Sequence, residues 1–245
     1  MNKIIRCGNK NSLKAAVLLV LRTLCAIILI LLPIAFVILK LYRDKLLTAA
    51  LIILIILCAA ALPILSKRYK ILHSGTRGEK QLFKTVRKLK GNNIIFTNLP
   101  VKYNGRSEVD ALVINQGGVI IIEAKNHSGM IYGNWRADKW EQQKRRRNKN
   151  TVLEMENPIK QMRRQRDIVK GMLNAAGENI KVDTVLFFSN DNVRLNLNLR
   201  GEDHVCHGSS ELLDFLEKYS RKKVLSKSRA EKCAGILNNA RTNSA

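Results

Sequence analysis

The sequence lacks the paired cysteines of disulfide-rich and zinc-binding proteins. Its five cysteines are scattered without a CxxC pair, and two of them lie inside hydrophobic runs. This usage argues against a disulfide framework or a zinc knuckle and is typical of a reducing compartment. His204, Cys206 and His207 stand close together but have no second ligand pair nearby, so we expect a strand end there and not a metal site.

Several catalytic motifs are also missing. The chain contains no glycine-rich phosphate loop, no HExxH, no GxSxG and no evident internal repeat. The enzyme classes that these motifs define are therefore disfavoured, and we expect no small-molecule cofactor.

Acidic residues are few compared with basic ones. The chain has 19 Asp and Glu against 43 Lys and Arg, which gives a formal net charge of +24. The hydrophobic first quarter contributes little of this charge, so the remainder is strongly basic. Such a surface attracts polyanions, either nucleic acid or an anionic membrane face.

Two long hydrophobic runs occupy the first quarter of the chain. We predict transmembrane helices at residues 15–39, with Arg22 snorkelling near one end, and at residues 46–65. The connector, residues 40–45, is short enough to make the pair a hairpin. A buried hairpin of a soluble protein is the alternative, but Thr48 is the single polar side chain that we find in the second run.

Basic residues are more numerous outside the hairpin than in its connector. This bias predicts that both termini and the following domain are cytoplasmic, and the architecture suits a bacterial inner membrane. The residues are Lys3, Arg6, Lys10 and Lys14 before the first span, Lys67, Arg68 and Lys70 after the second, and Lys40, Arg43 and Lys45, offset by Asp44, between them.

The rest of the chain has the pattern of an α/β domain. We divide the whole chain into a basic N-terminus at 1–14, the two spans within 15–65, a linker at 66–75, an α/β domain at 76–220 and a basic tail at 221–245. The order of strands and helices after residue 150 indicates crossovers and hence a partly parallel sheet. Strands are predicted at 93–99, 109–114, 119–123, 130–135, 139–143 and 182–188, and helices from 76 or 78 to 91, from 158 to about 173 and from 209 or 210.

The stretch GGVIIIEAKNHSG, residues 117–129, has an unusual ending. Four β-branched residues are followed by Glu123, Ala124 and Lys125, which puts two opposite charges where burial would normally continue. Because side chains alternate along a strand, Glu123 and Lys125 project to the same face, and their Cα atoms are about 6–7 Å apart.

A hairpin turn brings a second acid to this face. If Gly117 and Gly118 are the two central residues of the turn, Asp110 pairs with Lys125 and shares a face with Glu123. A three-residue turn would instead place Asp110 on the opposite face.

Two acids and a lysine at one strand end are the parts of a metal-assisted phosphodiesterase. Carboxylates about 5 Å apart repel when both are ionised, and a shared Mg²⁺ relieves the repulsion. A neighbouring lysine can hold the attacking water and offset charge on a phosphate. The alternative is a plain lysine–glutamate salt bridge at a sheet edge, since E-x-K is frequent by chance.

Four motifs resemble the nuclease-related domain family, NERD, of the PD-(D/E)xK nuclease superfamily. They are GE at 78–79, EVDALVI at 108–114, GGVIIIEAKNHSG, and NPIKQ at 157–161. The resemblance implies a restriction-endonuclease-like mixed sheet flanked by helices and a nuclease that acts on nucleic acid, DNA more than RNA. One departure is Val109, where the superfamily has proline.

The resemblance also implies the roles of particular residues. Asp110 and Glu123 would ligate Mg²⁺ or Mn²⁺, and Lys125 would activate water. Glu79 would be an auxiliary ligand or orienting group, and Gln161 a further polar site residue.

A basic run, KRRRNK at 144–149, and a basic helix face are candidates for phosphate contacts. We predict the run as a solvated loop, and the alternative for both is a surface facing anionic lipid. The residues are Lys144, Arg145, Arg146, Arg147, Arg163 and Arg164. Two rival functions remain open: a non-catalytic module that tethers nucleic acid to the membrane, and a membrane scaffold.

Overall fold

The chain forms two compact units. A computed structural model describes residues 2–8, 10–39, 43–146 and 149–242. One unit is Asn9–Thr76, and the other combines Met1–Gly8 with Arg77–Ala245.

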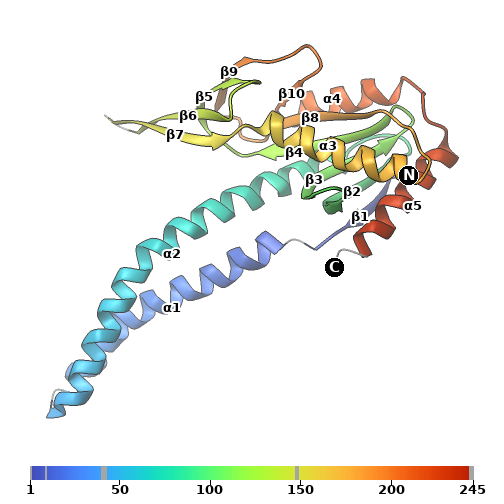
Figure 1. The fold of residues 1–245 in the computed structure, drawn as a ribbon. Coiled ribbons are helices and arrows are strands. Elements are labelled where there is room, and N and C mark those ends of the chain that lie inside the picture. The colour runs from blue at the N-terminus through green and yellow to red at the C-terminus, as the bar shows by residue number, and fades with distance from the viewer. Residues whose placement is uncertain (1, 9, 40–42, 147–148, 243–245) are drawn as a thin grey trace. The chain divides into compact units, whose positions relative to one another are not determined.

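Two long helices make up the smaller unit (Figure 1). They are α1 (Lys10–Ile38) and the first part of α2 (Lys45–Val86). Asp44 caps α2, because its Oδ1 accepts hydrogen bonds from two backbone N–H groups of the first turn. The guanidinium of Arg22 lies 4.8 Å from the ring centroid of Tyr69 and so links the helices. Both are long and apolar enough to cross a membrane.

The predicted linker is helical. The runs at 15–39 and 46–65 fall almost entirely within α1 and α2, and residues 40–42 of the connector lie outside the described residues. Residues 66–75 contain no proline and only Gly75 as a weak helix breaker. Nothing therefore ends α2 there, and the helix that we expected to start near residue 76 is its continuation.

A six-stranded mixed sheet forms the centre of the larger unit, in the order β1-β2-β3-β4-β8-β10. The pairs β2–β3 and β3–β4 are antiparallel, whereas β1–β2, β4–β8 and β8–β10 are parallel. The predicted mixed sheet is confirmed. Its strands are β1 (Lys3–Arg6), β2 (Ile94–Lys102), β3 (Arg106–Asn115), β4 (Gly118–Lys125), β8 (Val182–Phe188) and β10 (His204–His207).

Helices cover both faces of this sheet and create two apolar layers. Leu82 and Val86 at the end of α2 and residues of α4 (Gly208–Ser220) pack on one face. The other face carries α3 (Pro158–Ala175) and α5 (Lys227–Thr242), as Figure 1 shows. All of α5 comes from the tail, residues 221–245, to which the sequence assigned no structure, and β1 comes from the predicted basic N-terminus.

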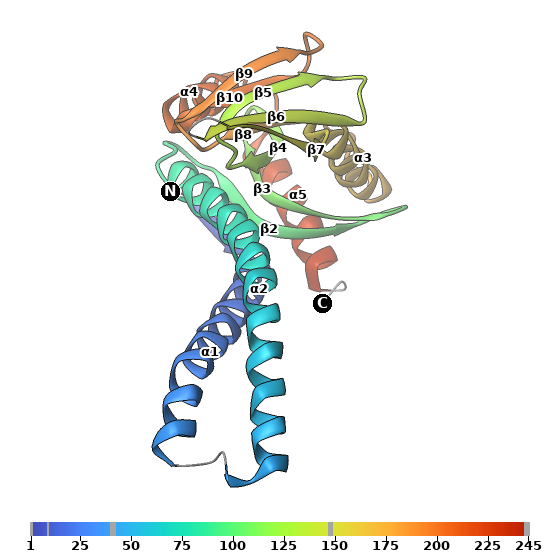
Figure 2. The same cartoon turned by 90° about the vertical axis from the view of Figure 1, so that its left-hand side faces the viewer.

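A second sheet of four strands stands beside the first, in the order β7-β6-β5-β9 (Figure 2). The predicted hairpin of residues 130–143 is present, but residues 144–146 and 149 of the basic run belong to strands and not to a loop. The backbone pairing of β6 with β7 continues up to Arg146 and Lys149, and residues 147–148 lie outside the described part. The strands are β5 (Gly129–Asn134), β6 (Lys139–Arg146), β7 (Lys149–Glu156) and β9 (Val193–Asn198).

The turn between β3 and β4 sets the register. Asn115 pairs with Gly118, so the central residues are Gln116 and Gly117. The Gly117 N–H donates to Asn115 Oδ1 at 2.8 Å, and a Cβ on Gly117 would lie 2.1 Å from the Tyr219 carbonyl oxygen. The predicted register is therefore wrong by two residues. Because two is an even number, the faces of the strand are unchanged.

Candidate active site

The candidate site lies at the end of β4, inside the main sheet. Residues 119–122 are fully buried, and Glu123, which follows them, is only 3% exposed. Pairing with β8 continues through Lys125. A carboxylate in such a place is unfavourable unless it is paired or hydrogen-bonded. The partners of Glu123 therefore decide what this strand end can do.

Both carboxylate oxygens of Glu123 have a partner. Lys125 Nζ donates to Oε1 at 2.7 Å, and Gln165 Nε2, from α3, donates to Oε2 at 2.9 Å. Lys125 also donates to Gln161 Oε1 at 3.1 Å. Its side chain is 20% exposed, so the ammonium group lies between the buried acid and solvent.

Gln165 also bonds to the backbone of β3. Its Nε2 donates to the Glu108 carbonyl at 2.9 Å, and the register partner of Glu108 is Pro100, which has no N–H to offer. Because both neighbouring groups, the Glu108 carbonyl and the Glu123 carboxylate, are acceptors, the NH₂ end of the Gln165 amide faces them. Gln165 Oε1 is consequently buried, and it has no hydrogen-bond partner among the described residues.

The start of α3 is anchored to the second sheet. Asn157 Oδ1 accepts from Ile159 N at 2.9 Å, and Pro158 follows as the first helical residue. Asn157 Nδ2 contacts three carbonyl groups of the turn that joins β5 and β6. Because Gln161 and Gln165 are one turn apart, this anchored helix presents both amides to β4.

Asp110 sits where the ladders of β3 are interrupted. The pairing with β4 ends at Ala111, and continuing the count by one pair places Asp110 opposite Glu123. The pairing with β2 also skips Asp110, and its counterpart there, Asn98, has a positive φ of 52°. Asp110 Oδ2 instead accepts from the Ala124 N–H at 2.8 Å. The Asp110 carboxylate thus accepts a backbone N–H of β4 at the point where the regular strand pairing of β3 is interrupted.

The charges of two further acids, Glu123 and Glu79, and of one lysine, Lys125, act on Asp110. Burial, followed by the nearby Glu123 carboxylate, raises the pKa of Asp110 well above its usual value. Glu79 raises that pKa further, whereas Lys125 and the hydrogen bond from Ala124 lower it. The negative charges are therefore close enough to oppose ionisation of Asp110.

Close packing explains how Glu79 reaches this region. A Cβ on the preceding residue, Gly78, would lie 3.0 Å from Asn126 Cβ. The glycine lets α2 approach the chain just beyond β4, which brings Glu79 near Asp110.

His127 is a further titratable group beside the site. Its Nδ1 lies 3.2 Å from Gln142 Oε1 of β6. Burial and then the charge of Lys125 lower the pKa of His127, and Lys144 lowers it further. The base of the basic hairpin is thus close to the candidate site.

These residues fit a hard divalent cation. Within the described part of the chain, no group of three or more His, Cys, Asp or Glu side chains has metal-binding geometry. Mg²⁺ needs only one or two carboxylates, with waters completing its shell. The like-charged pair Asp110 and Glu123 supplies the carboxylate oxygens that such an ion could bind, and a cation there would relieve the repulsion between them.

The predicted site residues come together, but the basic residues do not form one surface. Asp110, Glu123, Lys125, Glu79 and Gln161 meet at the end of β4. The predicted phosphate contacts divide between β6 and α3: Lys144 and Arg145 lie on β6, and Arg164 is exposed on α3. Arg163 Nη2 donates to both carboxylate oxygens of Asp203, at 2.9 Å each. The Arg146 side chain and Arg147 lie outside what the structure describes.

Sequence reasoning missed Gln165 and His127. Gln165 had a usable signal, since it stands four residues after Gln161 on one helix face. His127 had none, because β4 ends at Lys125 and side-chain alternation cannot be extended into the loop.

Comparisons with known proteins place part of the chain in a family. Residues 74–189 match the family described as nuclease-related domain, NERD. A Bacillus anthracis protein described as uncharacterized is 32% identical over 93 residues, which are 36% of this chain and 44% of that protein. The chain thus matches less than half of that relative's length. No solved structure matches the chain significantly.

The matched range contains every residue of the candidate site, from Glu79 to Gln165. The resemblance predicted from the motifs is therefore confirmed. Residues 74–189 of this chain form a nuclease-related domain, which belongs to the PD-(D/E)xK nuclease superfamily.

Proposed function

We propose that this domain hydrolyses phosphodiester bonds of nucleic acid, DNA in preference to RNA, with Mg²⁺ or Mn²⁺. The observation that carries the proposal is the meeting of Asp110, Glu123 and Lys125 at one buried strand end. A salt bridge with no further role would need neither the second acid nor a buried glutamine that holds the first.

Each side chain has a distinct part in this proposal. Asp110 and Glu123 would hold the cation, which when bound would supply Lewis-acid polarisation of the phosphate and activation of a water. Gln165 fixes the orientation of the Glu123 carboxylate. Lys125, shared between Glu123 and Gln161, orients the attacking water and offsets the negative charge that develops on the phosphate.

Glu79 is proposed to orient groups near Asp110. Its charge already influences Asp110 from the neighbouring helix, which supports an auxiliary role.

The basic hairpin is proposed to hold the nucleic-acid backbone. Lys144, Arg145 and Arg194 line a cavity of about 270 Å³ between β6, β7 and β9. Lys144 is also near enough to His127 to lower its pKa, so this basic surface begins beside the candidate site. Lysine and arginine contacts to phosphates give affinity without sequence preference.

We further propose that α1 and α2 anchor the domain to a membrane, with both termini in the cytoplasm. The length and composition of the helices and the bias of basic residues support this topology. Reporter fusions at each end test it. A cytoplasmic signal at both ends is expected, and a periplasmic signal at either end would contradict the topology.

The proposal is tested by incubating the full-length protein in detergent with DNA or RNA, with Mg²⁺ or with EDTA. Cleavage is expected with Mg²⁺ and should be lost in Glu123→Gln. Glu154→Gln is the matched control, since Glu154 is a 64%-exposed acid paired with Lys139. Cleavage that survives Glu123→Gln would reject the assignment.

A non-catalytic binding module is the second candidate function. One observation favours it: both oxygens of Glu123 already have protein partners. Binding that persists in EDTA, without cleavage under any divalent ion, would support this candidate.

A further inference from the structure

A groove of about 520 Å³ lies between α1 and α2 within the smaller unit. It is formed by one face of each helix, because its lining residues recur at helical spacing on both. Each face presents one cation on an apolar background. The lining residues are Leu13, Lys14, Val17 and Leu18 of α1 and Arg68, Ile71 and Leu72 of α2.

Two apolar side chains of this groove are exposed beyond the ends of the predicted spans. Leu13 is 69% exposed and Ile71 is 64% exposed. They lie just outside residues 15–39 and 46–65, so the hydrocarbon core of a bilayer would end beside them. An amphiphile that entered the groove would remove their surface from water.

No acid of the smaller unit lies near the two cations of the groove. Residues 9–76 contain a single acid, Asp44, which caps the opposite end of α2. Arg68 is about 36 Å further along that helix. A cleft lined by charges of one sign concentrates counter-ions. Lys14 and Arg68 therefore make the groove complementary to an anion.

In the proposed membrane topology, both cations lie at the level of the lipid phosphates. Lys14 directly precedes the first predicted span, and Arg68 lies about 4.5 Å beyond the second. Next to Arg68, the ring of Tyr69 receives the guanidinium of Arg22 at 4.8 Å from its centroid. Tyrosine rings and the heads of snorkelling arginines are both typical of the membrane interface.

We propose that this groove binds one anionic phospholipid, with its phosphate between Lys14 and Arg68. The glycerol and upper acyl carbons contact the apolar side chains of the groove. A zwitterionic phospholipid would bring its own ammonium group to the two cations, so it binds less tightly. Inorganic phosphate would leave the apolar side chains uncovered. The inference rests on the proposed membrane anchoring and does not depend on nuclease activity.

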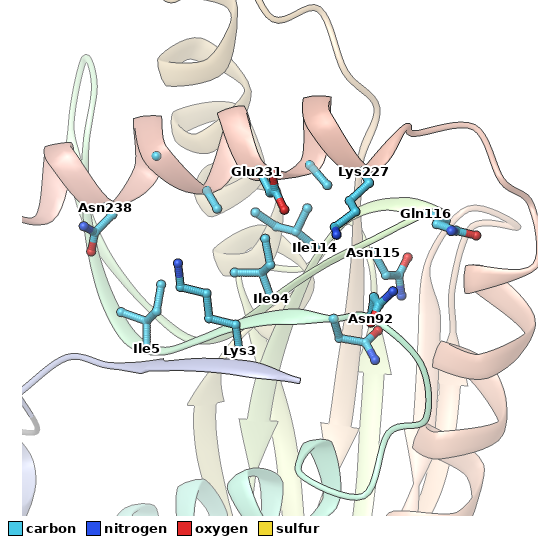
Figure 3. A pocket seen from close by; sticks show the side chains of 14 residues that line it. Lys3, Ile5, Asn92, Ile94, Ile114, Asn115, Gln116, Lys227, Glu231 and Asn238 are labelled. Atoms are coloured by element: carbon cyan, nitrogen blue, oxygen red, sulfur yellow. The ribbon is translucent and has the colours of Figure 1, made fainter. Parts of the chain in front are cut away.

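A cavity of similar volume in the larger unit lacks this one-sided charge. It measures about 560 Å³ and lies between α5 and the strands β1, β2 and β3 (Figure 3). Its lining includes the acid Glu231 together with Lys3 and Lys227. Because a carboxylate among the lysines reduces the attraction for an anion, this cavity provides a comparison site within the same chain.

Binding is measured by native mass spectrometry of the full-length protein in a neutral detergent. The probes are dioleoylphosphatidylglycerol and dioleoylphosphatidylcholine, which share their acyl chains and differ in headgroup charge. One phosphatidylglycerol should bind at least about tenfold more tightly than phosphatidylcholine, which corresponds to about 1.4 kcal/mol. Equal binding of the two phospholipids would overturn the proposal, as would displacement of phosphatidylglycerol by inorganic phosphate at the same concentration.

Charge variants locate the headgroup. Lys14→Gln combined with Arg68→Gln should weaken phosphatidylglycerol binding about tenfold or more. Lys67→Gln combined with Lys70→Gln removes the same charge from exposed positions of α2 outside the groove, and should have little effect. Equal weakening by the two pairs would show a diffuse basic surface and not a site. If Lys227→Gln abolishes binding and the groove pair does not, the lipid occupies the cavity of Figure 3 and the proposal is wrong.

A matched pair of bulky substitutions locates the acyl chains. Val17→Trp should abolish binding by filling the groove, whereas Val20→Trp, the same change at an exposed position of α1 outside it, should not. Circular dichroism verifies that each variant keeps its helices. Because the reporter fusions test the membrane topology separately, equal binding of the two phospholipids by a protein with the expected topology would reject the lipid site alone.

Discussion

The substitution Gln165→Leu would remove the amide that holds Glu123 in place while keeping a side chain of similar volume. Gln165 is fully buried, and its Nε2 serves two acceptors, Glu123 Oε2 and the Glu108 carbonyl. Leucine leaves both acceptors without this donor. It also removes Oε1, which lacks a partner among the described residues.

These effects have opposite signs, so the expected loss of stability is small. Losing the bond to a charged carboxylate costs about 1.5–3 kcal/mol, and losing the bond to a carbonyl costs about 0.5–1.5 kcal/mol. Removing a buried unpaired oxygen returns about 1–3 kcal/mol. The free energy of unfolding should fall by about 1 kcal/mol, whereas cleavage activity should fall more steeply because the Glu123 carboxylate is no longer oriented.

Urea denaturation followed by tryptophan fluorescence measures this loss. Both tryptophans of the chain, Trp135 and Trp140, belong to the larger unit, so the signal reports that unit. Gln143→Leu, the same change at an exposed position of β6, is the control. Unchanged stability together with unchanged activity in Gln165→Leu would refute the positioning role. A loss near 3 kcal/mol in the absence of divalent ions would show that Oε1 has a partner.

Three further predictions follow from the described contacts. Because the pKa of Asp110 is raised in the folded state, the protein loses stability as the pH rises through that pKa and Asp110 ionises. Asp110→Asn should therefore melt at a higher temperature than the parent at about pH 8, and this gain should shrink toward about pH 4. A gain in melting temperature that does not depend on pH would contradict the electrostatic cause. Lys144→Gln combined with Arg145→Gln should weaken DNA binding and lower the slope of log K against log salt by about 2, and an unchanged slope in fluorescence anisotropy would exclude these residues from the interface. Gly117→Ala should lower the free energy of unfolding by about 1–3 kcal/mol, because its Cβ would meet the Tyr219 carbonyl oxygen, and a fully stable variant would show that the turn can shift.

The clearest sequence signals came from strands with strong local patterns. The β-branched run before Glu123 predicted β4, and its abrupt change to charged residues predicted the site. The turn register was wrong because Asn115 bonds to Gly117 and moves the turn back by one residue at each side. This shift does not by itself change the face on which Asp110 is predicted, since strand faces depend only on whether the shift is odd or even.

Elements that depend on distant partners were not predictable. β1 has four residues, and its pairing with β2 brings together segments about ninety residues apart in the chain. β7 continues from a basic run whose composition resembles a solvated loop, and it is ordered by pairing with β6. In contrast, β9 alternates buried or half-buried with exposed residues, so its period of two could have revealed it.

The same distinction holds inside the site. The motifs identified the acids, Lys125 and Gln161, because each stands in a recognisable local pattern. The role of Gln165 depends on α3 packing over β3, and on Pro100, which has no N–H, being the register partner of Glu108. Neither fact can be inferred from the sequence close to Gln165.

The central claim is that Asp110 and Glu123 together hold a divalent cation. Electron paramagnetic resonance of Mn²⁺ titrated into the full-length protein tests this claim most directly, because it needs neither substrate nor turnover. We predict one bound Mn²⁺ that is displaced by Mg²⁺, absent in Glu123→Gln and retained in Glu154→Gln. Equal Mn²⁺ binding by the parent and by Glu123→Gln, or no binding by the parent, would contradict the account.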